Sequence, residues 1–131
     1  MGTIKVVCGI IYKDDTVLIC RRKPEKSLGG FWEFPGGKVE LNESYEESLI
    51  RELKEELALE VKIKRPFITH THQYGENSIE LISYICTTSQ DKIQSTDHDQ
   101  IEWIYTINLL DFKLAAADIP IAKALINSEE I

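Results

Sequence analysis

The sequence predicts an α/β fold in one domain, residues 1–131, and three observations support this. The chain has 131 residues, of which 43% are hydrophobic, which is enough for one substantial core but too little for two. Several short apolar runs have the alternation or the β-branched content of strands. Residues 44–57 instead repeat their apolar side chains at the spacing of an amphipathic helix.

The first half of the chain begins with a predicted β-hairpin. Two apolar strands, Ile4–Ile11 and Thr16–Cys20, flank the polar turn 13–15. A basic loop, residues 21–30, follows and leads into the aromatic and glycine-rich segment 31–38. The helix comes next, because Ser44 and Glu47 have the spacing of a capping box.

The second half is predicted to contain three more strands and two helices. The strands are Val61–Phe67, Ser78–Thr87 and Ile101–Tyr105, and the helices are Ile107–Phe112 and a last one that starts at Asp118, near Pro120, and runs to about Asn127. His70 and His72 are expected between the first two of these strands. With no third nitrogen or thiolate ligand near them in the sequence, a structural or solvent role is favoured over metal binding. Residues 89–100 are expected to form a polar loop.

Charge and cysteine content disfavour several classes of function. The net charge is −7, so polymeric nucleic acid and anionic membranes are poor partners. Cys8, Cys20 and Cys86 each lie in an apolar, strand-like run without C-x-x-C spacing, which predicts reduced, buried thiols of a cytoplasmic protein, with no disulfide or zinc site. The apolar run near the N-terminus is too short for a signal or membrane segment.

The predicted helix carries an unusual group of carboxylates. Glu52, Glu55 and Glu56 fall on one side of it, next to an apolar stripe. Like charges at i,i+4 destabilise a helix by roughly 0.2 to 0.5 kcal/mol per pair, so this face calls for a positive partner. Carboxylate oxygens suit Mg²⁺ or Mn²⁺, which also bind phosphates. The alternative is a solvated acidic helix face.

Here the chain resembles a known family. Gly37, Glu43 and the run Arg51-Glu52-Leu53-Lys54-Glu55-Glu56-Leu57-Ala58-Leu59 resemble the Nudix box, G-x5-E-x7-R-E-U-x-E-E-x-G-U, where U is aliphatic. The single fixed position that departs is Ala58, which stands where the box has glycine. Because alanine adopts a left-handed conformation at a cost of roughly 1 to 2 kcal/mol, we expect the helix to run further or to end differently.

The resemblance covers nearly the whole chain, including the segment Trp32–Lys38, and points to the MutT-like and CTP-pyrophosphohydrolase-like branch. It implies the Nudix fold, an α/β/α sandwich around a mixed β-sheet. It also implies Mg²⁺-dependent hydrolysis of a nucleoside triphosphate to the monophosphate and pyrophosphate, with Mn²⁺ as a substitute. The implied metal ligands are the Gly36 carbonyl and the carboxylates of Glu52, Glu55 and Glu56.

Further site residues are expected around these ligands. Asp97, six residues before Trp103, is expected to act as a metal ligand or a general base. Arg51 is placed to orient carboxylates, together with Glu43. The residues expected to contact the substrate are Arg22 and Lys38, which would bind phosphates, and Phe34 and Asp118.

Asp118 lies where CTP-type relatives carry an aspartate in the base pocket. An ionised carboxylate only accepts hydrogen bonds and therefore suits an exocyclic amine such as that of cytosine, while 8-oxo-dGTP stays a second candidate substrate. Capping of the last helix is an alternative role for Asp118. Two other functions stay open: a Nudix module that senses a nucleotide without hydrolysing it, and, from Tyr74, a dinucleoside polyphosphate hydrolase. The expected partner is a small nucleotide, and the protein is expected to be a monomer or a homodimer.

Overall fold

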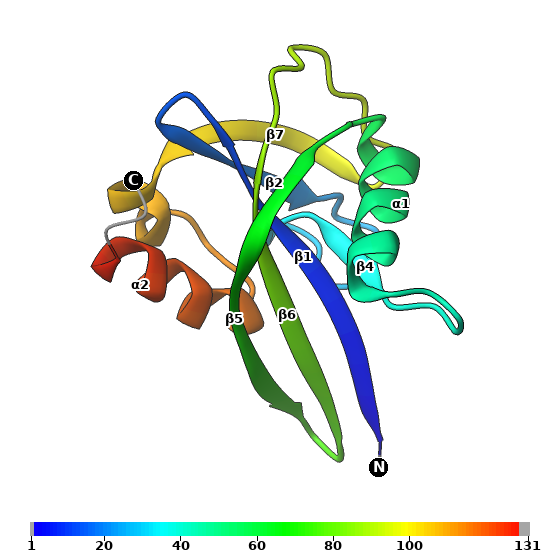
Figure 1. Ribbon diagram of the computed structural model, residues 1–131. Helices are drawn as coiled ribbons and strands as arrows, with labels where there is room; N and C mark the ends of the chain where they lie inside the picture. The colour runs from blue at the N-terminus through cyan, green and yellow to red at the C-terminus, as the bar shows by residue number, and fades with distance from the viewer. Residues whose placement is uncertain (1, 129–131) are drawn as a thin grey trace.

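The computed structural model describes residues 2–128 and contains one mixed seven-stranded sheet with an α-helix on each side (Figure 1). The strands run in the order β3-β2-β1-β6-β5, while β4 pairs with β1 and β7 pairs with β2. This confirms the predicted α/β class. The elements are β1 (Thr3–Lys13), β2 (Thr16–Arg22), β3 (Trp32–Glu33), β4 (Gly36–Lys38), α1 (Tyr45–Leu57), β5 (Lys62–Tyr74), β6 (Asn77–Thr87), β7 (His98–Tyr105), the 3₁₀ helices η1 (Thr106–Asp111) and η2 (Ala116–Asp118), and α2 (Ile119–Asn127).

Two apolar layers form because side chains along each strand alternate between the faces of the sheet. On β1, Cys8 and Ile10 join the cluster that includes Ile121 of α2. Val7 and Ile11 join the cluster formed with Leu49, Leu53 and Leu57 of α1. The two helices therefore cover opposite faces of the sheet, and the apolar stripe of α1 is buried while its carboxylate side is left at the edge.

Strand β4 brings the two glycines of the box region next to β1. Its Cα partners are Val7 for Gly37 and Cys8 for Gly36. A Cβ atom on Gly36 would overlap the Val7 carbonyl oxygen and stand 2.7 Å from the Cys8 Cα, so only glycine fits there. The glycine pair thus holds the backbone close against β1, and Gly37 lies against Glu52 in the middle of α1.

The strands extend beyond their predicted bounds, and for two strands in the second half of the chain this changes where functional candidates lie. The prediction ended one strand at Phe67 and placed His70 and His72 in a connection, but β5 continues to Tyr74 and carries both histidines. Pro66 does not end the strand, because β5 is at the edge of the sheet and its pairing with β6 shifts register around this residue. Strand β7 likewise begins at His98, which pairs with Arg22 of β2, rather than at Ile101.

The end of α1 also differs from expectation. The helix ends at Leu57, and Ala58 adopts the left-handed conformation with φ 51° and ψ 40° that a box glycine would adopt. Leu57 and Leu59 are both buried, which is worth about 1.5 to 3 kcal/mol for each side chain and exceeds the cost of left-handed alanine. The expectation of a longer or different helix end is therefore wrong. The Gln90 amide donates to the Ala58 carbonyl at 2.7 Å and ties the loop after β6 to this turn.

All three cysteines are buried free thiols, and burial raises the pKa of Cys86 to about 12. Within residues 2–128, no helix has the length and apolar character that a membrane crossing requires.

Candidate functional site

The carboxylates of α1 differ in how far they are buried. Glu52 and Glu56 are half-buried, whereas the side chain of Glu55 is 63% exposed. Gly37 of β4 packs against Glu52, since a Cβ atom on residue 37 would stand 2.5 Å from Glu52 Oε2. The glycine at the start of the box therefore leaves the space that the Glu52 carboxylate occupies.

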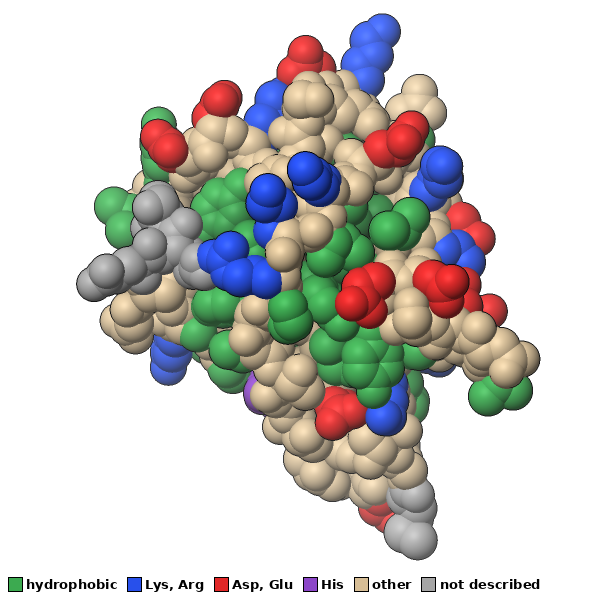
Figure 2. All heavy atoms as spheres, viewed as in Figure 1, with side chains coloured by type: hydrophobic (Ala, Val, Ile, Leu, Met, Phe, Trp, Pro, Cys, Tyr) green, Lys and Arg blue, Asp and Glu red, His purple; other side chains and the backbone are tan. Residues whose placement is uncertain are grey.

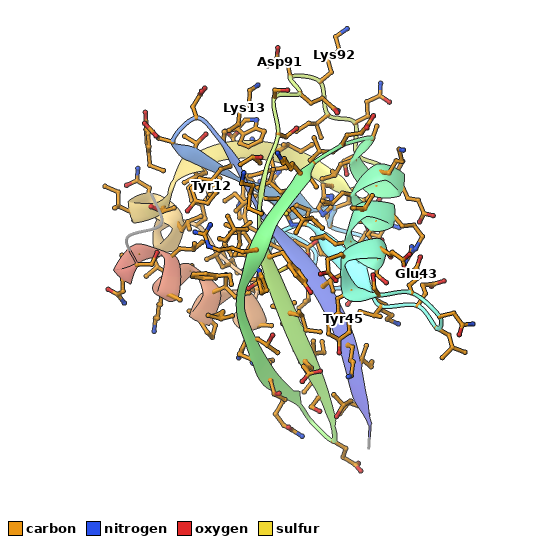
Figure 3. All side chains as sticks on the ribbon, in the orientation of Figure 1. Tyr12, Lys13, Glu43, Tyr45, Asp91 and Lys92 are labelled. Carbon is orange, nitrogen blue, oxygen red and sulfur yellow. The ribbon has the colours of Figure 1, made fainter. Side chains whose placement is uncertain are left out.

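Arg51 lies at the centre of an ion-pair network beside these acids. Its guanidinium donates to both oxygens of Glu43, at 2.8 and 3.0 Å, and to Glu52 and Glu55 at 3.2 and 3.3 Å. Ser48 donates a further hydrogen bond of 2.7 Å to Glu43, and Arg51 and Ser48 together lower the pKa of Glu43. Figure 3 shows Glu43 just before the N-terminal end of α1, so the network joins the loop before α1 to the middle of the helix.

Glu56 is surrounded by other acids. Burial, followed by the charges of Glu52, Glu33 and Asp97, raises its pKa to about 8, while Arg22 acts in the opposite direction. Acids from α1, β3 and the loop before β7 thus gather on one side of the molecule. On the face that Figure 2 shows, acidic side chains lie on the side of α1, next to an apolar centre.

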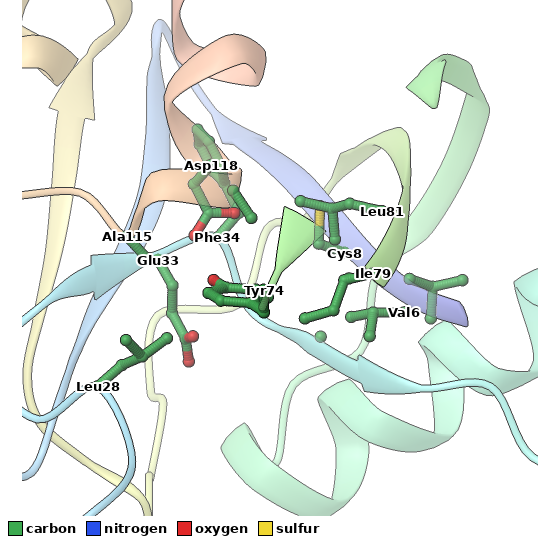
Figure 4. A pocket seen from close by; sticks show the side chains of 13 residues that line it. Val6, Cys8, Leu28, Glu33, Phe34, Tyr74, Ile79, Leu81, Ala115 and Asp118 are labelled. Carbon is green, nitrogen blue, oxygen red and sulfur yellow. The ribbon is translucent and has the colours of Figure 1, made fainter. Parts of the chain in front are cut away.

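A pocket with mostly apolar walls lies next to this acidic cluster. Glu33, Phe34 and Gly36 line it from the segment of β3 and β4, and Tyr74 of β5 and Asp118 of η2 line it as well. Figure 4 shows Glu33, Phe34, Tyr74 and Asp118 around this pocket. Burial, followed by the charges of Asp118 and Glu33, raises the pKa of Tyr74, so both carboxylates lie near its hydroxyl group. Of the predicted substrate contacts, Phe34 and Asp118 therefore share one pocket with the Gly36 backbone.

Asp118 is 6% exposed and makes no capping hydrogen bond, although it occupies the N-cap position of α2. The helix-cap alternative is therefore wrong. Burial, and then the charge of Glu33, raise the pKa of Asp118 well above its usual value. Next to it, His70 bonds through Nε2 to the Ala117 carbonyl at 2.8 Å, and because a carbonyl only accepts, this nitrogen carries the proton.

The other predicted site residues, Asp97, Arg22 and Lys38, differ in how they are related to the pocket and the acidic cluster. Asp97 forms an ion pair of 3.2 Å with Lys26 of the basic loop, and its backbone carbonyl accepts a bond from Lys23. Arg22 donates to the Ser27 carbonyl and, at 3.3 Å, to Glu33. Lys38 is exposed and does not line the pocket, although its carbonyl accepts a bond from Arg51. Arg22, but not Lys38, thus contacts a wall of the pocket.

Sequence reasoning missed Glu33, Ser48 and His98. Glu33 stands between the buried Trp32 and Phe34, and this alternation was a usable signal that an acid faces the opposite side from two core aromatics. Ser48 lies inside the helix, and the sequence pattern gives no sign of its hydrogen bond to Glu43. The role of His98 depends on the pairing of β7 with β2 and leaves no local pattern in the sequence.

The donor set fits a divalent cation in its chemistry. Glu52 and Glu56 offer hard oxygen ligands, each has a pKa raised first by burial, and Gly37 leaves room for one of the carboxylates. Among residues 2–128, no three Asp, Glu, His or Cys side chains already converge at metal-ligand distance. Glu52 and Glu55 instead bond to Arg51, which would have to share them with a metal.

Comparison with known proteins decides the family. Residues 6–124 match the NUDIX domain family. The chain belongs to the Nudix family. It is 34% identical to the CTP pyrophosphohydrolase of Escherichia coli K12 over 95% of this chain and 92% of that protein. It is 35% identical to the 8-oxo-dGTP diphosphatase of Proteus vulgaris over 69% and 81% of the two chains.

Solved structures agree with this assignment. The solution structure of the Escherichia coli ORF135 protein superposes with a TM-score of 0.85 at 33% identity, over 96% of this chain and 90% of that one. The Nudix hydrolase MutT of methicillin-resistant Staphylococcus aureus 252 gives 0.76 at 37% identity, over 95% of both chains. The Nudix fold expected from the sequence is confirmed, and the protein is a Nudix hydrolase of the MutT and CTP pyrophosphohydrolase type.

Proposed function

We propose that this Nudix hydrolase cleaves nucleoside triphosphates to the monophosphate and pyrophosphate in the presence of Mg²⁺. The observation that carries the proposal is the position of Glu56, which lies among Glu52, Glu33 and Asp97 at the edge of an apolar pocket. A polyphosphate bound there needs positive charge between itself and these acids. A divalent cation supplies that charge and lowers the pKa of a bound water.

Each residue of the cluster has a role in this proposal. The carboxylates of Glu52, Glu55 and Glu56 and the Gly36 carbonyl would hold Mg²⁺, or Mn²⁺ as a substitute. Arg51, fixed by Glu43, orients the carboxylates of Glu52 and Glu55 through its hydrogen bonds. Arg22 and the exposed Lys38 would bind phosphate oxygens, and Asp97 would serve as a ligand or as a base once Lys26 releases it.

The pocket would bind the base. Phe34 provides an apolar wall, while Asp118 and Glu33 provide oxygens that accept hydrogen bonds from an amine. We therefore propose CTP- or dCTP-type nucleotides as substrates, with oxidised nucleotides such as 8-oxo-dGTP second. Both classes occur in the names of similar proteins, and hydrolysis of either removes a nucleotide from the cellular pool.

A substrate panel tests the proposal. The purified protein is incubated with CTP, dCTP, 5-methyl-dCTP, dGTP and 8-oxo-dGTP, with Mg²⁺, with Mn²⁺, or with EDTA, and the release of pyrophosphate is measured against the release of phosphate. Metal-dependent release of pyrophosphate and a monophosphate is expected. Release of phosphate instead, or equal rates with EDTA, contradicts the proposal.

The same panel addresses the other functions. Binding of nucleotides without turnover would indicate a sensor, and diadenosine tetraphosphate cleaved faster than every triphosphate would indicate a dinucleoside polyphosphate hydrolase. We further propose a cytoplasmic monomer or homodimer, which sedimentation of the purified protein tests.

A further inference from the structure

His98 is a fully buried histidine that bonds through both of its ring nitrogens. Its side chain is 0% exposed. Nε2 lies 2.8 Å from Glu33 Oε2, and Nδ1 lies 2.8 Å from Ser95 Oγ. The backbone N–H of His98 also donates to Ser95 Oγ, at 3.1 Å. The imidazole therefore connects the start of β7 to the wall of the nucleotide pocket.

The chemistry of the partners fixes the direction of these bonds. An ionised Glu33 carboxylate only accepts, so Nε2 carries a proton and donates it. Ser95 Oγ already accepts the backbone N–H, and its own hydroxyl proton is free to be donated to Nδ1. The neutral Nε2–H tautomer thus satisfies both ring nitrogens and needs no charge on the buried ring.

The two carboxylate oxygens of Glu33 differ in their hydrogen bonds. Oε2 accepts from His98 and, at 3.3 Å, from Arg22. Oε1 accepts no hydrogen bond from any residue between 2 and 128, while the Glu33 side chain lines the pocket together with Asp118 and Tyr74. A carboxylate held through one oxygen presents the other one in a fixed direction.

We propose that His98 is a positioning residue of the nucleotide pocket, which holds Glu33 so that Oε1 accepts a hydrogen bond from the bound nucleotide. The inference rests on the proposed function for the identity of the ligand. The donor is an N–H of the base or a hydroxyl of the sugar. If His98 acts through Glu33 in this way, its loss weakens nucleotide binding rather than the chemical step.

A substitution of His98 could also act indirectly, through the neighbouring residue Asp97. Asp97 precedes His98 directly, so a disturbed His98 can also displace the Asp97 carboxylate from Lys26 and from the cluster around Glu56. That route predicts a loss in kcat with little change in KM. The two routes are therefore separated by which kinetic constant changes.

The test compares two substitutions that differ in reach. In His98→Gln, the amide can still donate to Glu33 from near the place of Nε2, whereas in His98→Asn the shorter amide cannot reach it. We expect His98→Asn to raise KM for the best triphosphate and Kd for its monophosphate roughly tenfold or more, as for one hydrogen bond to a charged group, with kcat within about threefold. His98→Gln should recover most of this loss.

Two further comparisons test whether the weaker binding depends on Glu33 and which group of the nucleotide donates the hydrogen bond. In a Glu33→Gln background, His98→Asn should add little to the loss of nucleotide binding. Both changes remove the same interaction, the hydrogen bond that the nucleotide donates to Glu33 Oε1. Comparing CTP with UTP and CTP with dCTP shows whether the lost partner is the base amine or the 2′-hydroxyl. Additive effects, equal damage by Gln and Asn, or a fall in kcat at constant KM overturns the proposal.

If the variants fold poorly, the tautomer of His98 can be measured in the wild-type protein instead. The ¹⁵N shifts of the His98 ring at neutral pH should show a protonated Nε2, and a ring with Nε2 unprotonated overturns the proposal. Calorimetric binding of CMP and 8-oxo-dGMP does not depend on turnover. A wild-type protein that hydrolyses no triphosphate would therefore refute the proposed function while leaving the role of His98 open to this measurement.

Discussion

Gly37 lies directly against the carboxylate of Glu52, so that a Cβ atom on residue 37 would stand 2.5 Å from Glu52 Oε2. The neighbouring Gly36 faces a different obstacle, because a Cβ atom there would overlap the Val7 backbone. One glycine thus leaves space for a functional group that can move, and the other leaves space for a strand that cannot.

This difference predicts different phenotypes for two alanine substitutions. Gly37→Ala should push the Glu52 carboxylate aside, and we expect at least a tenfold loss of kcat/KM and a higher Mg²⁺ requirement, with the melting temperature changed little. Gly36→Ala should separate β4 from β1 and lower stability by several degrees in melting temperature. Thermal unfolding and Mg²⁺ titrations of activity on both variants check this. Equal melting temperatures for the two variants would contradict it.

Glu56→Gln should lose most of the activity, because it removes a charge from the proposed metal site and keeps the shape of the side chain. We expect kcat to fall by about 10²-fold or more at saturating Mg²⁺. The variant should be no less stable than wild type in EDTA at neutral pH, since wild-type Glu56 faces the charges of Glu52, Glu33 and Asp97. A kcat near that of wild type would remove Glu56 from the site.

Asp97→Asn provides the matched comparison. Asp97 lies at the end of a loop and is already paired with Lys26, so another carboxylate can replace it as base. Its loss should therefore lower kcat by less than Glu56→Gln does under the same conditions. A larger loss in Asp97→Asn would reverse the order of importance proposed for these acids.

Ala58→Gly should stabilise the protein, because residue 58 already has the left-handed conformation that glycine adopts without strain. We expect the free energy of unfolding to rise by about 1 kcal/mol and activity to stay unchanged. Lys54→Gly, on the exposed side of the same helix, is the control and should lower it by about 1 kcal/mol. Urea unfolding measures both, and an Ala58→Gly variant less stable than wild type would refute the strain argument.

Ala58 also shows what the sequence could and could not predict. Periodicity and capping located α1 and the side that carries Glu52 and Glu56, because these signals come from residues of one continuous segment of the sequence. The helix end depends on the burial of Leu59 and on Gln90, which lies more than thirty residues away. The local sequence pattern therefore indicated the backbone strain at Ala58, but not the long-range contacts that compensate for it.

The pocket illustrates the same limit. Phe34 and Asp118 were expected to contact the substrate because of a family resemblance, and the structure places both in one pocket. The contact between Glu33 and His98 follows from the pairing of β2 with both β3 and β7, which brings together residues 65 positions apart. Such non-local pairing has no counterpart in the local pattern of the chain.

The buried carboxyl of Asp118 should make stability depend on pH. Its pKa in the folded protein is raised by burial and by Glu33, while in the unfolded chain it is about 3.9. Between these two values the folded state binds more protons, so this group favours folding at low pH, and its contribution falls as pH rises through the folded pKa. Asp118→Asn cannot ionise, and its stability relative to wild type should therefore increase from pH 5 to pH 8.5 in urea unfolding. A constant difference would contradict the raised pKa.

The raised pKa of Asp118 also revises the argument about base selection. When ionised, the carboxylate only accepts hydrogen bonds and suits the amine of cytosine, but when protonated it donates and accepts as an amide does, and can also meet a carbonyl of 8-oxoguanine. Because the ionised fraction of Asp118 grows with pH, Asp118→Asn should raise kcat/KM for 8-oxo-dGTP relative to CTP by more at pH 8.5 than at pH 6. The ratio of two substrates on one enzyme cancels any pH effect on the shared chemical step. Leu28→Ala, at the pocket wall but without a titratable group, is the control and should shift the ratio equally at both pH values. If the ratio in Asp118→Asn equals that of wild type at every pH, Asp118 does not contact the base.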